Sequence, residues 1–518
     1  MKLYQTISRS FQAVTLSILV LALGLAGATV RAASAASNTP DFAAIDAYLV
    51  AQMKDQRIPG LALGIVQGEQ IVHLKGFGQA DASGRPITPQ TPFVLASVSK
   101  PITSLAVMQL VEQGKINLDA PVQRYLPWFR VADPDASSHI TVRHLLNHTS
   151  GLPESADVAL LTSTDTSEGA LERQVRDLHS FELNRPVGAT FEYVNANYAT
   201  LGLIVQTVSG QSYEAYVQRH VFAPLEMRHS FTSQAEAQPD GLASGSRYWF
   251  GVPIPANIPD NRAERPNGRL IASAEDMAHF LIAQLNDGRY AGTALLSPAG
   301  MATMHQPAVT IGDGAGYGLG WYSGQRNGVT TVEHAGDGIN FHANVVLIPD
   351  HGLGFVLLEN AQNGLKPERM SGIARGVSSL LLGEQPATLE TGGLKLMVYY
   401  AVLVLAVIQL FGMIWSIRQI RRWRAQPEDR PHGWRGIVWH VVLPLVLNLA
   451  HGFVFLVGLP ALFGTTLAYL CLYVPDFGYT LIVSGSVALI WAIVRTMLVW
   501  QLLRDRLTAG AIPMLKQA

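Results

Sequence analysis

Three long apolar tracts near the C-terminal end place the strongest constraint on how this chain can fold. Residues 396–417 and 437–475 contain no Asp, Glu, Lys or Arg, and residues 478–503 carry only Arg495 as a charged residue. A helix of about 20 apolar residues crosses the hydrocarbon core of a bilayer, because it satisfies its own backbone polar groups. We therefore predict an all-α transmembrane module with about three helices over residues 394–503.

The tract at 437–475 could hold one span and a Pro/Gly-containing remainder, or two spans, and the arginines favour the first. Six arginines occupy the connection after the first tract, at positions 418, 421, 422, 424, 430 and 435. Cytoplasmic connections carry an excess of Lys and Arg. Three spans put these arginines and the tail at 504–518 in the cytoplasm, whereas four would put the tail outside. Arg495 lies near the cytoplasmic end of its span, so we expect its charge to reach the interface.

The first 36 residues have the pattern of an export signal. Lys2 and Arg9 precede an apolar stretch at 13–28, and Ala33-Ser34-Ala35 offers a small-residue cleavage site. An uncleaved anchor is the alternative, although the apolar stretch is short for a span. Either way, the residues that follow are expected on the periplasmic or extracellular side of the cell membrane.

Composition excludes several classes of function. The net charge is −1 and no basic run precedes residue 390, so we expect no nucleic-acid partner. The only cysteine, Cys471, lies in an apolar tract, so no intrachain disulfide can form and a thiol-based site is not expected. His144 and His148 are four residues apart but lack the glutamate of a zinc-protease helix, so we interpret them as structural. No metal and no cofactor are expected.

Residues 37–385 predict a layered α/β (α+β) domain in which helices flank an antiparallel sheet. Helical spacing follows residues 41, 97, 195 and 273, and short apolar or alternating segments predict strands at 61–67, 70–76, 330–334, 343–348 and 354–358. Residues 238–268 are rich in Pro, Gly and Asn, which is typical of a lid or binding loop. Tyr248 and Trp249 within it are candidates for substrate binding.

The candidate chemistry begins at Ser97-Val98-Ser99-Lys100, at the start of a predicted helix. A spacing of three puts the hydroxyl and the amine on one helix face, and the helix N-terminus favours developing negative charge. Alone, this pattern is more often the first turn of an ordinary helix. Two further patterns accompany it: Tyr193-Val194-Asn195 before an apolar helix, and His334-Ala335-Gly336 at the end of a strand.

Together these three motifs, over roughly residues 41–362, resemble the serine β-lactamase/penicillin-binding-protein superfamily. The similarity is to its class C-like branch, which includes D-alanyl-D-alanine carboxypeptidases and family VIII esterases. Further matching segments are Leu-Leu-Asn-His-Thr-Ser-Gly-Leu at 145–152, Asn-Tyr at 197–198, Ser-Ala-Glu-Asp at 273–276 and Tyr-Gly-Leu-Gly-Trp at 317–321.

The resemblance implies a role for each motif residue. Ser97 would form an acyl-enzyme, and Asn195 would hold Lys100 and touch the substrate amide. Lys100 and Tyr193 would share the serine proton: a dry pocket lowers a lysine pKa, and neighbouring cations lower a phenol pKa, so either could be the base. His334 would hydrogen-bond Tyr193 or the substrate carboxylate side.

Backbone N–H groups of Ser97 and Asp337, beside Gly336, would form the oxyanion hole that the resemblance implies. His334 stands where class C β-lactamases carry lysine, which weakens a carboxylate anchor because histidine is largely neutral at pH 7. Asn340 stands where the family usually has glycine, so the resemblance does not define the shape of the substrate pocket.

We therefore expect a membrane-anchored serine hydrolase that cleaves an amide or ester through a Ser97 acyl-enzyme, on cell-wall D-Ala-type peptides or related acyl substrates. One alternative is a small-acyl or lipid esterase of the same fold. Another is a non-catalytic sensor that binds wall fragments and signals through its spans. The intact Ser97, Lys100 and Tyr193 argue against the sensor.

Overall fold

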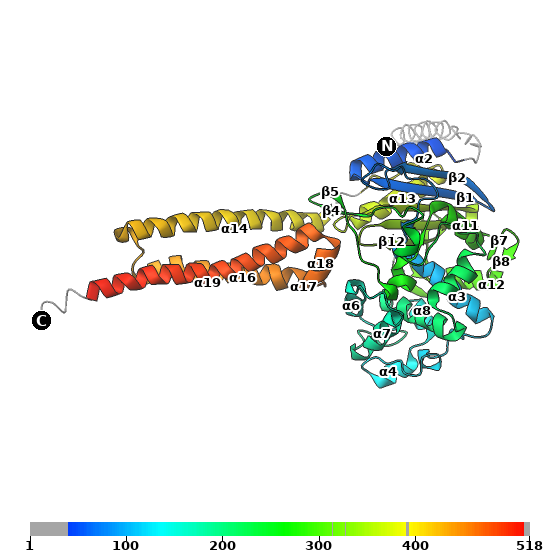
Figure 1. Ribbon diagram of the computed structural model, residues 1–518, viewed down its shortest axis with the longest axis horizontal. Coiled ribbons are helices and arrows are strands. Elements are labelled where there is room, and N and C mark those ends of the chain that lie inside the picture. The colour runs from blue at the N-terminus through cyan, green and yellow to red at the C-terminus, as the bar shows by residue number, and fades with distance from the viewer. Residues whose placement is uncertain (1–39, 313, 327, 390–392, 512–518) are drawn as a thin grey trace, which may run out of the picture.

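The computed structural model describes residues 40–312, 314–326, 328–389 and 393–511, so the predicted export signal lies outside the described residues. The described chain forms two parts, a layered α/β domain and a bundle of long helices that projects from one side of it (Figure 1). The α/β domain is the β-lactamase-like arrangement that the sequence predicts, an antiparallel sheet with helices on both faces.

The central sheet has eight strands, and every neighbouring pair is antiparallel. In spatial order they are β2 (Gln70–Gly78), β1 (Gly60–Gln67), β14 (Leu353–Glu359), β13 (His342–Ile348), β12 (Val329–Asp337), β11 (Tyr322–Arg326), β10 (Ala315–Tyr317) and β9 (Val309–Gly312). Strands β13 and β14 are buried along their whole length because helices cover both of their faces. The sequence indicated the five long strands and missed the three short ones at the β9 edge.

One face of the sheet packs against α2 (Phe42–Gln56) and α13 (Pro367–Leu381). The other face packs against α11 (Ala274–Leu285), with α3 (Ser99–Glu112) and α8 (Asn195–Ser209) beyond it in a larger core. The remaining helices of this domain are α4 (Pro134–His139), α5 (Val142–Leu146), α6 (Asp157–Thr162), α7 (Ala170–Asp177), α9 (Tyr213–Val217), α10 (Gln234–Ala237) and α12 (Pro298–His305). Two-stranded ribbons pair β3 (Phe93–Val94) with β6 (Ile271–Ala272) and β7 (Arg289–Tyr290) with β8 (Thr293–Ala294).

The segment predicted as a long loop at 238–268 contains a β-hairpin instead. Strands β4 (Ser246–Trp249) and β5 (Val252–Pro255) pair with each other, and β4 also pairs with β15 (Ala361–Gln362). These pairings give the middle of the segment a regular backbone, which its Pro, Gly and Asn content did not indicate. The hairpin lies beside the start of the helical bundle (Figure 1).

The described part of the chain contains three helices that are long and apolar enough to cross a membrane, at Gly393–Ala425, Gly433–Leu462 and Pro475–Arg504. In the structure they correspond to α14 (Gly393–Ala425), to a continuous run through α15 (Gly433–Ile437), α16 (Leu443–Phe453) and α17 (Leu459–Leu462), and to most of α19 (Pro475–Ala511). A short helix, α18 (Leu467–Tyr473), joins the second to the third. The last turns of α14 and the connection after it, which together carry the six arginines, lie at the end remote from the α/β domain (Figure 1).

Arg495 does not reach toward the end of its helix as the sequence analysis expected. Its side chain is buried inside the bundle, where Nε donates to Ser416 Oγ at 2.7 Å and Nη1 donates to the carbonyl oxygen of His440 at 2.6 Å. Arg495 thereby links all three apolar helices, because a charge in a dry bundle needs hydrogen-bond acceptors on its neighbours.

Candidate active site

Ser97 lies in a single 3₁₀ turn, η1 (Ala96–Val98), that leads directly into α3. Ala96 has a φ of +47°, in the left-handed region that a residue with a Cβ rarely adopts. The surrounding structure holds this turn: the N–H of Leu95 donates to the carbonyl of Leu270 at 2.9 Å. Strain of this kind is common where a side chain must be presented to a ligand, and Ser97 is half-buried on the wall of a cavity.

The amine of Lys100 is fully buried and has three hydrogen-bond partners. Its Nζ lies 3.0 Å from Ser97 Oγ, 2.7 Å from Asn195 Oδ1 and 2.8 Å from the carbonyl oxygen of Asn267. Two of these partners can only accept, whereas the serine hydroxyl can also donate. A neutral amine has two N–H groups and one lone pair, so it matches this set when Ser97 donates to it. The arrangement is that of a base poised beside a nucleophile.

Burial lowers the pKa of Lys100 to about 7, against the opposing effect of the Asp157 and Glu264 carboxylates. Removing a charged amine from water disfavours its protonated form. A large fraction of Lys100 is therefore neutral near pH 7 and able to accept a proton.

Asp157, which the sequence analysis did not single out, orients Asn195 toward Lys100. Its Oδ2 accepts from the backbone N–H and from Nδ2 of Asn195, both at 2.8 Å, and its Oδ1 accepts from the N–H of Ala196 at 2.9 Å. The carboxylate thus satisfies the first N–H groups of α8 from outside the helix. Burial raises the pKa of Asp157 to about 6, although these N–H donors lower it.

The Tyr193 ring packs against both the lysine and a buried histidine. Lys100 Nζ lies 4.7 Å from its centroid, and the His148 ring lies 4.4 Å away. Burial raises the pKa of Tyr193 well above its ordinary value, in spite of its hydrogen bond with Ser97. The expectation that cations lower this pKa was wrong, because the effect of burial outweighs every contact that lowers it. Tyr193 therefore keeps its proton near neutral pH.

His334 is buried and neutral. Its Nδ1 lies 2.7 Å from the carbonyl oxygen of Ala335, which can only accept, so Nδ1 carries the hydrogen. Nε2 is then the acceptor for the Tyr317 hydroxyl at 3.2 Å. Burial lowers the pKa of His334 to about 3, and Lys100 lowers it further. The expected partner was Tyr193 or the substrate carboxylate side, and the ring centroid of Tyr193 is 6.3 Å from that of His334.

Strand β12 passes directly against the nucleophile turn at Gly336. A Cβ on this glycine would lie 2.3 Å from the carbonyl oxygen of Leu95 and 3.2 Å from the nitrogen of Ser97, so only glycine allows this approach. The next residue, Asp337, turns its carboxylate away from Ser97 toward β13, where Oδ1 accepts from His342 Nδ1 at 2.9 Å and from Gln362 Nε2 at 2.7 Å.

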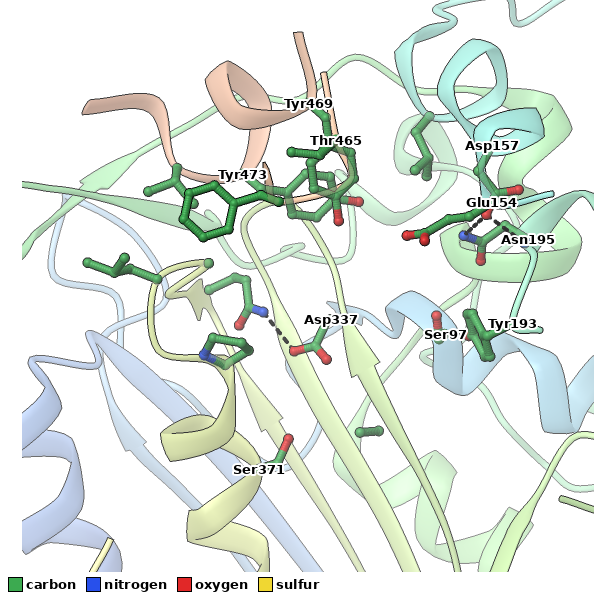
Figure 2. A pocket seen from close by; sticks show the side chains of 18 of the residues that line it. Ser97, Glu154, Asp157, Tyr193, Asn195, Asp337, Ser371, Thr465, Tyr469 and Tyr473 are labelled. Atoms are coloured by element: carbon green, nitrogen blue, oxygen red, sulfur yellow. Dashed lines mark hydrogen bonds between the residues drawn. The ribbon is translucent and has the colours of Figure 1, made fainter. Parts of the chain in front are cut away.

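These side chains border a cavity of about 880 Å³. Of the predicted residues, it is lined by Ser97, Tyr193, Asn195, His334 and Asp337. Figure 2 shows Ser97, Tyr193 and Asn195 on one side of the cavity and residues of the helical bundle, Thr465, Tyr469 and Tyr473, on the other.

Tyr248 and Trp249, the other predicted substrate contacts, lie elsewhere. The hydroxyl of Tyr248 donates to the carbonyl of Gln56 at 2.7 Å, and the Trp249 ring stacks on Tyr479 of α19 with centroids 5.8 Å apart. Tyr248 thus joins β4 to the end of α2, and Trp249 joins β4 to α19.

The two histidines at 144 and 148 serve different structural contacts. His144 Nδ1 accepts from the N–H of Thr141, and His148 Nδ1 accepts from the N–H of Val194 at 3.2 Å. Within the described ranges, no group of three or more His, Cys, Asp and Glu side chains could hold a metal ion.

The sheet, the helices and the Ser97–Lys100 arrangement define a β-lactamase-like domain of the serine-hydrolase type. The Beta-lactamase family model matches residues 45–376, so the chain belongs to that family. This match ends before the first of the three long apolar helices.

Two curated relatives illustrate the range of the family. Protein flp of Staphylococcus aureus (strain MW2) is 29% identical over 328 residues, which cover 62% of this chain and 64% of that protein. Penicillin-binding protein 4 of Amycolatopsis lactamdurans is 30% identical over 315 residues, which cover 59% of this chain and 82% of the relative.

Solved structures extend the comparison. The octameric penicillin-binding protein homologue from Pyrococcus abyssi has a TM-score of 0.59 and 28% identity, covering 67% of this chain and 79% of that one. EstCE1, a hydrolase with promiscuous acyltransferase activity, has a TM-score of 0.54 and 25% identity, covering 62% of this chain and 93% of that one.

Gly336→Ala should slow acylation of Ser97 about 10²-fold, because the added methyl group pushes β12 and the N–H of Asp337 away from Ser97. The measurement is the rate of labelling by a fluorophosphonate probe. Gly324→Ala on the neighbouring strand is the control, since its Cβ would meet only ordinary contacts at 3.5 Å. A rate for Gly336→Ala within twofold of the unchanged protein would contradict the proposed proximity.

Asp157→Asn should move the pH dependence of ester hydrolysis to lower pH. Activity requires neutral Lys100, so kcat/KM should rise with pH through an inflection near 7. The Asp157 charge raises the pKa of Lys100, and removing it lowers that pKa. Glu154→Gln, on the same cavity wall, is the matched control and should leave the inflection in place. An unchanged or alkaline inflection for Asp157→Asn would contradict the assignment.

Proposed function

We propose that this protein is a membrane-anchored serine hydrolase that cleaves an ester or amide bond through an acyl-enzyme on Ser97. The observation that carries the proposal is the set of hydrogen bonds of the buried Lys100 amine. Two carbonyl oxygens accept from this amine, and the hydroxyl of Ser97 is its third hydrogen-bond partner. A lysine paired in this way is activated by burial, which is one of the recognised routes to an active nucleophile.

In the first half-reaction, neutral Lys100 takes the proton of Ser97 as its Oγ attacks the substrate carbonyl carbon. The developing oxyanion would lie at the N–H groups of Ser97 and Asp337, where β12 meets the nucleophile turn. The carbonyl then re-forms, the bond to the leaving group breaks, and the leaving alcohol or amine receives the proton by way of the Tyr193 hydroxyl. In the second half-reaction, water gives a proton to Lys100 as its oxygen attacks the acyl carbonyl carbon. The bond to Ser97 Oγ then breaks, Oγ takes the proton back from Lys100, and the acid is released.

Tyr193 acts in this scheme as a proton carrier, and Lys100 as the base. The raised pKa of Tyr193 makes its phenolate a rare form and so a poor general base. The hydrogen bond between Tyr193 and Ser97 puts the phenol next to the leaving group of the substrate. His334 supports the same wall as a neutral hydrogen-bond acceptor for Tyr317.

The charges around the cavity favour a substrate whose reacting end is uncharged. Neutral His334 supplies no cation, and the carboxylates of Glu154, Asp157, Glu333 and Asp337 line the same space. A free carboxylate next to the scissile bond would meet like charges there, which costs binding energy. Esters and blocked amides avoid this cost.

A second candidate is a carboxypeptidase or endopeptidase acting on cell-wall D-Ala-type peptides, and the similarity to penicillin-binding proteins favours it. The two cationic side chains on the cavity wall, Arg375 and Lys395, come from α13 and the start of α14. A labelled β-lactam that acylates Ser97 and stays bound would support the peptidase, whereas rapid turnover of p-nitrophenyl esters without a β-lactam adduct would support the esterase.

The proposed location is the cell membrane, with the α/β domain on the periplasmic or extracellular side. Three apolar helices of sufficient length support the anchoring. The arginine-bearing turn at the remote end supports the sidedness, because positive residues favour the cytoplasmic face.

Ser97→Ala should abolish labelling by a fluorophosphonate probe, and Lys100→Met should slow it by about 10²–10⁴-fold, the range expected for losing a general base. Ser371→Ala is the matched control, because this serine lines the same cavity at α13, away from Ser97 (Figure 2). Labelling is measured on the full chain in detergent, beside a known serine hydrolase. If the unchanged protein is not labelled while that enzyme is, the hydrolase proposal fails and the sensor alternative gains support.

A further inference from the structure

One wall of the catalytic cavity comes from outside the α/β domain, from the connection between the second and third apolar helices. We call residues 463–477 the roof segment; it contains α18. Its cavity-lining residues are Phe463, Gly464, Thr465, Thr466, Tyr469, Leu470, Tyr473, Val474 and Phe477. Thr465, Tyr469 and Tyr473 lie across the cavity from Ser97 and Tyr193 (Figure 2).

The roof segment is joined to the α/β domain by specific contacts. Arg247 Nη1 donates to the carbonyl oxygen of Leu472 at 3.1 Å, and the N–H of Phe250 donates to Asp476 Oδ2 at 2.8 Å. Gly364 allows a close approach, since a Cβ there would lie 2.4 Å from the carbonyl oxygen of Tyr473. The segment therefore occupies a defined position over the cavity.

The roof connects the cavity to the apolar interior of the bundle. Leu470 and Phe477, which line the cavity, belong to one buried cluster with Tyr399, Phe455 and Leu481 of the long helices. On the facing side, Val158 and Leu161 of α6 and Leu365 add apolar surface. The cavity thus has a polar end at Ser97 and, at the bundle, an end with apolar surface from Leu470 and Phe477 beside the cationic Lys395.

The end at the bundle lies at the level where the bundle meets the α/β domain. The β4–β5 hairpin at this junction leaves Phe250, Val252 and Ile254 with exposed fractions of 59%, 46% and 44%. Trp249 of the same hairpin stacks on Tyr479 of α19. Exposed apolar side chains beside long apolar helices are suited to the bilayer interface. In the proposed membrane orientation they put this end of the cavity at the level of the bilayer surface.

We propose that the roof segment binds the apolar chain of the substrate, and that the substrate class is an ester or amide whose acyl group is a long hydrocarbon chain taken up at the bilayer surface. This inference rests on the hydrolase function proposed above and narrows it. The cavity of about 880 Å³ is near the upper end of the 300–1,000 Å³ typical of ligand pockets, which leaves room beyond the reacting group. Each methylene that enters an apolar site strengthens binding by about fourfold.

The test compares p-nitrophenyl esters of two to ten carbons on the full chain in detergent. For the unchanged protein, kcat/KM should rise at least 100-fold from acetate to decanoate. Thr465→Trp fills the cavity beside the roof and should remove most of this rise, so that the ratio of decanoate to acetate kcat/KM falls at least tenfold. Ala468→Trp is the matched control: it adds the same bulk to an exposed position of α18 that does not line the cavity, and should keep the rise.

A flat or falling chain-length profile in the unchanged protein, or an unaltered profile in Thr465→Trp, would overturn the inference. Fluorophosphonate labelling of every variant distinguishes failure of this inference from failure of the hydrolase proposal. Labelled protein with a flat chain-length profile refutes only the binding of an apolar chain by the roof segment. Unlabelled native protein refutes that inference and the hydrolase function together. Reconstitution in phosphatidylglycerol vesicles identifies the source of the chain. Release of fatty acid that requires Ser97 assigns the membrane lipid itself, and decanoate cleavage without such release assigns a chain carried by another molecule.

Discussion

The burial of one amine is the constraint on which the rest of the site depends. A lysine removed from water must find hydrogen-bond partners or remain a large energetic cost. Lys100 finds them on three separate pieces of chain: its own turn, Asn195 at the start of α8 and the Asn267 carbonyl in η7 (Arg265–Arg269). The packing of α3 between α8 and η7 is therefore a condition for the chemistry as well as for the core.

The same burial leaves the site with two groups that change charge near neutral pH, Lys100 and Asp157. Burial pushes the pKa of Tyr193 up and that of His334 down to about 3, so both stay uncharged. Lys100, with a pKa of about 7, alone among these three is divided between its two forms.

Local patterns predicted much of this molecule. The spacing of Ser97 and Lys100, and the motifs at Tyr193 and His334, identified residues that the fold brings around one cavity, and the long strands and apolar helices were visible as periodicity or as charge-free tracts. What the sequence could not show depends on partners far away in the chain. Asp157 acts on a helix that begins 38 residues later, and the hairpin at 246–255 exists because β15 pairs with it.

The carboxylate of Asp476 joins three parts of the protein. Its Oδ2 accepts from the Tyr399 hydroxyl on α14 and from the N–H of Phe250 in the catalytic domain, while Asp476 itself begins the last long helix. These hydrogen bonds hold the α/β domain directly against the start of the long helices. In the proposed orientation the cavity therefore stays close to the bilayer, and its substrates are those that come to the membrane surface.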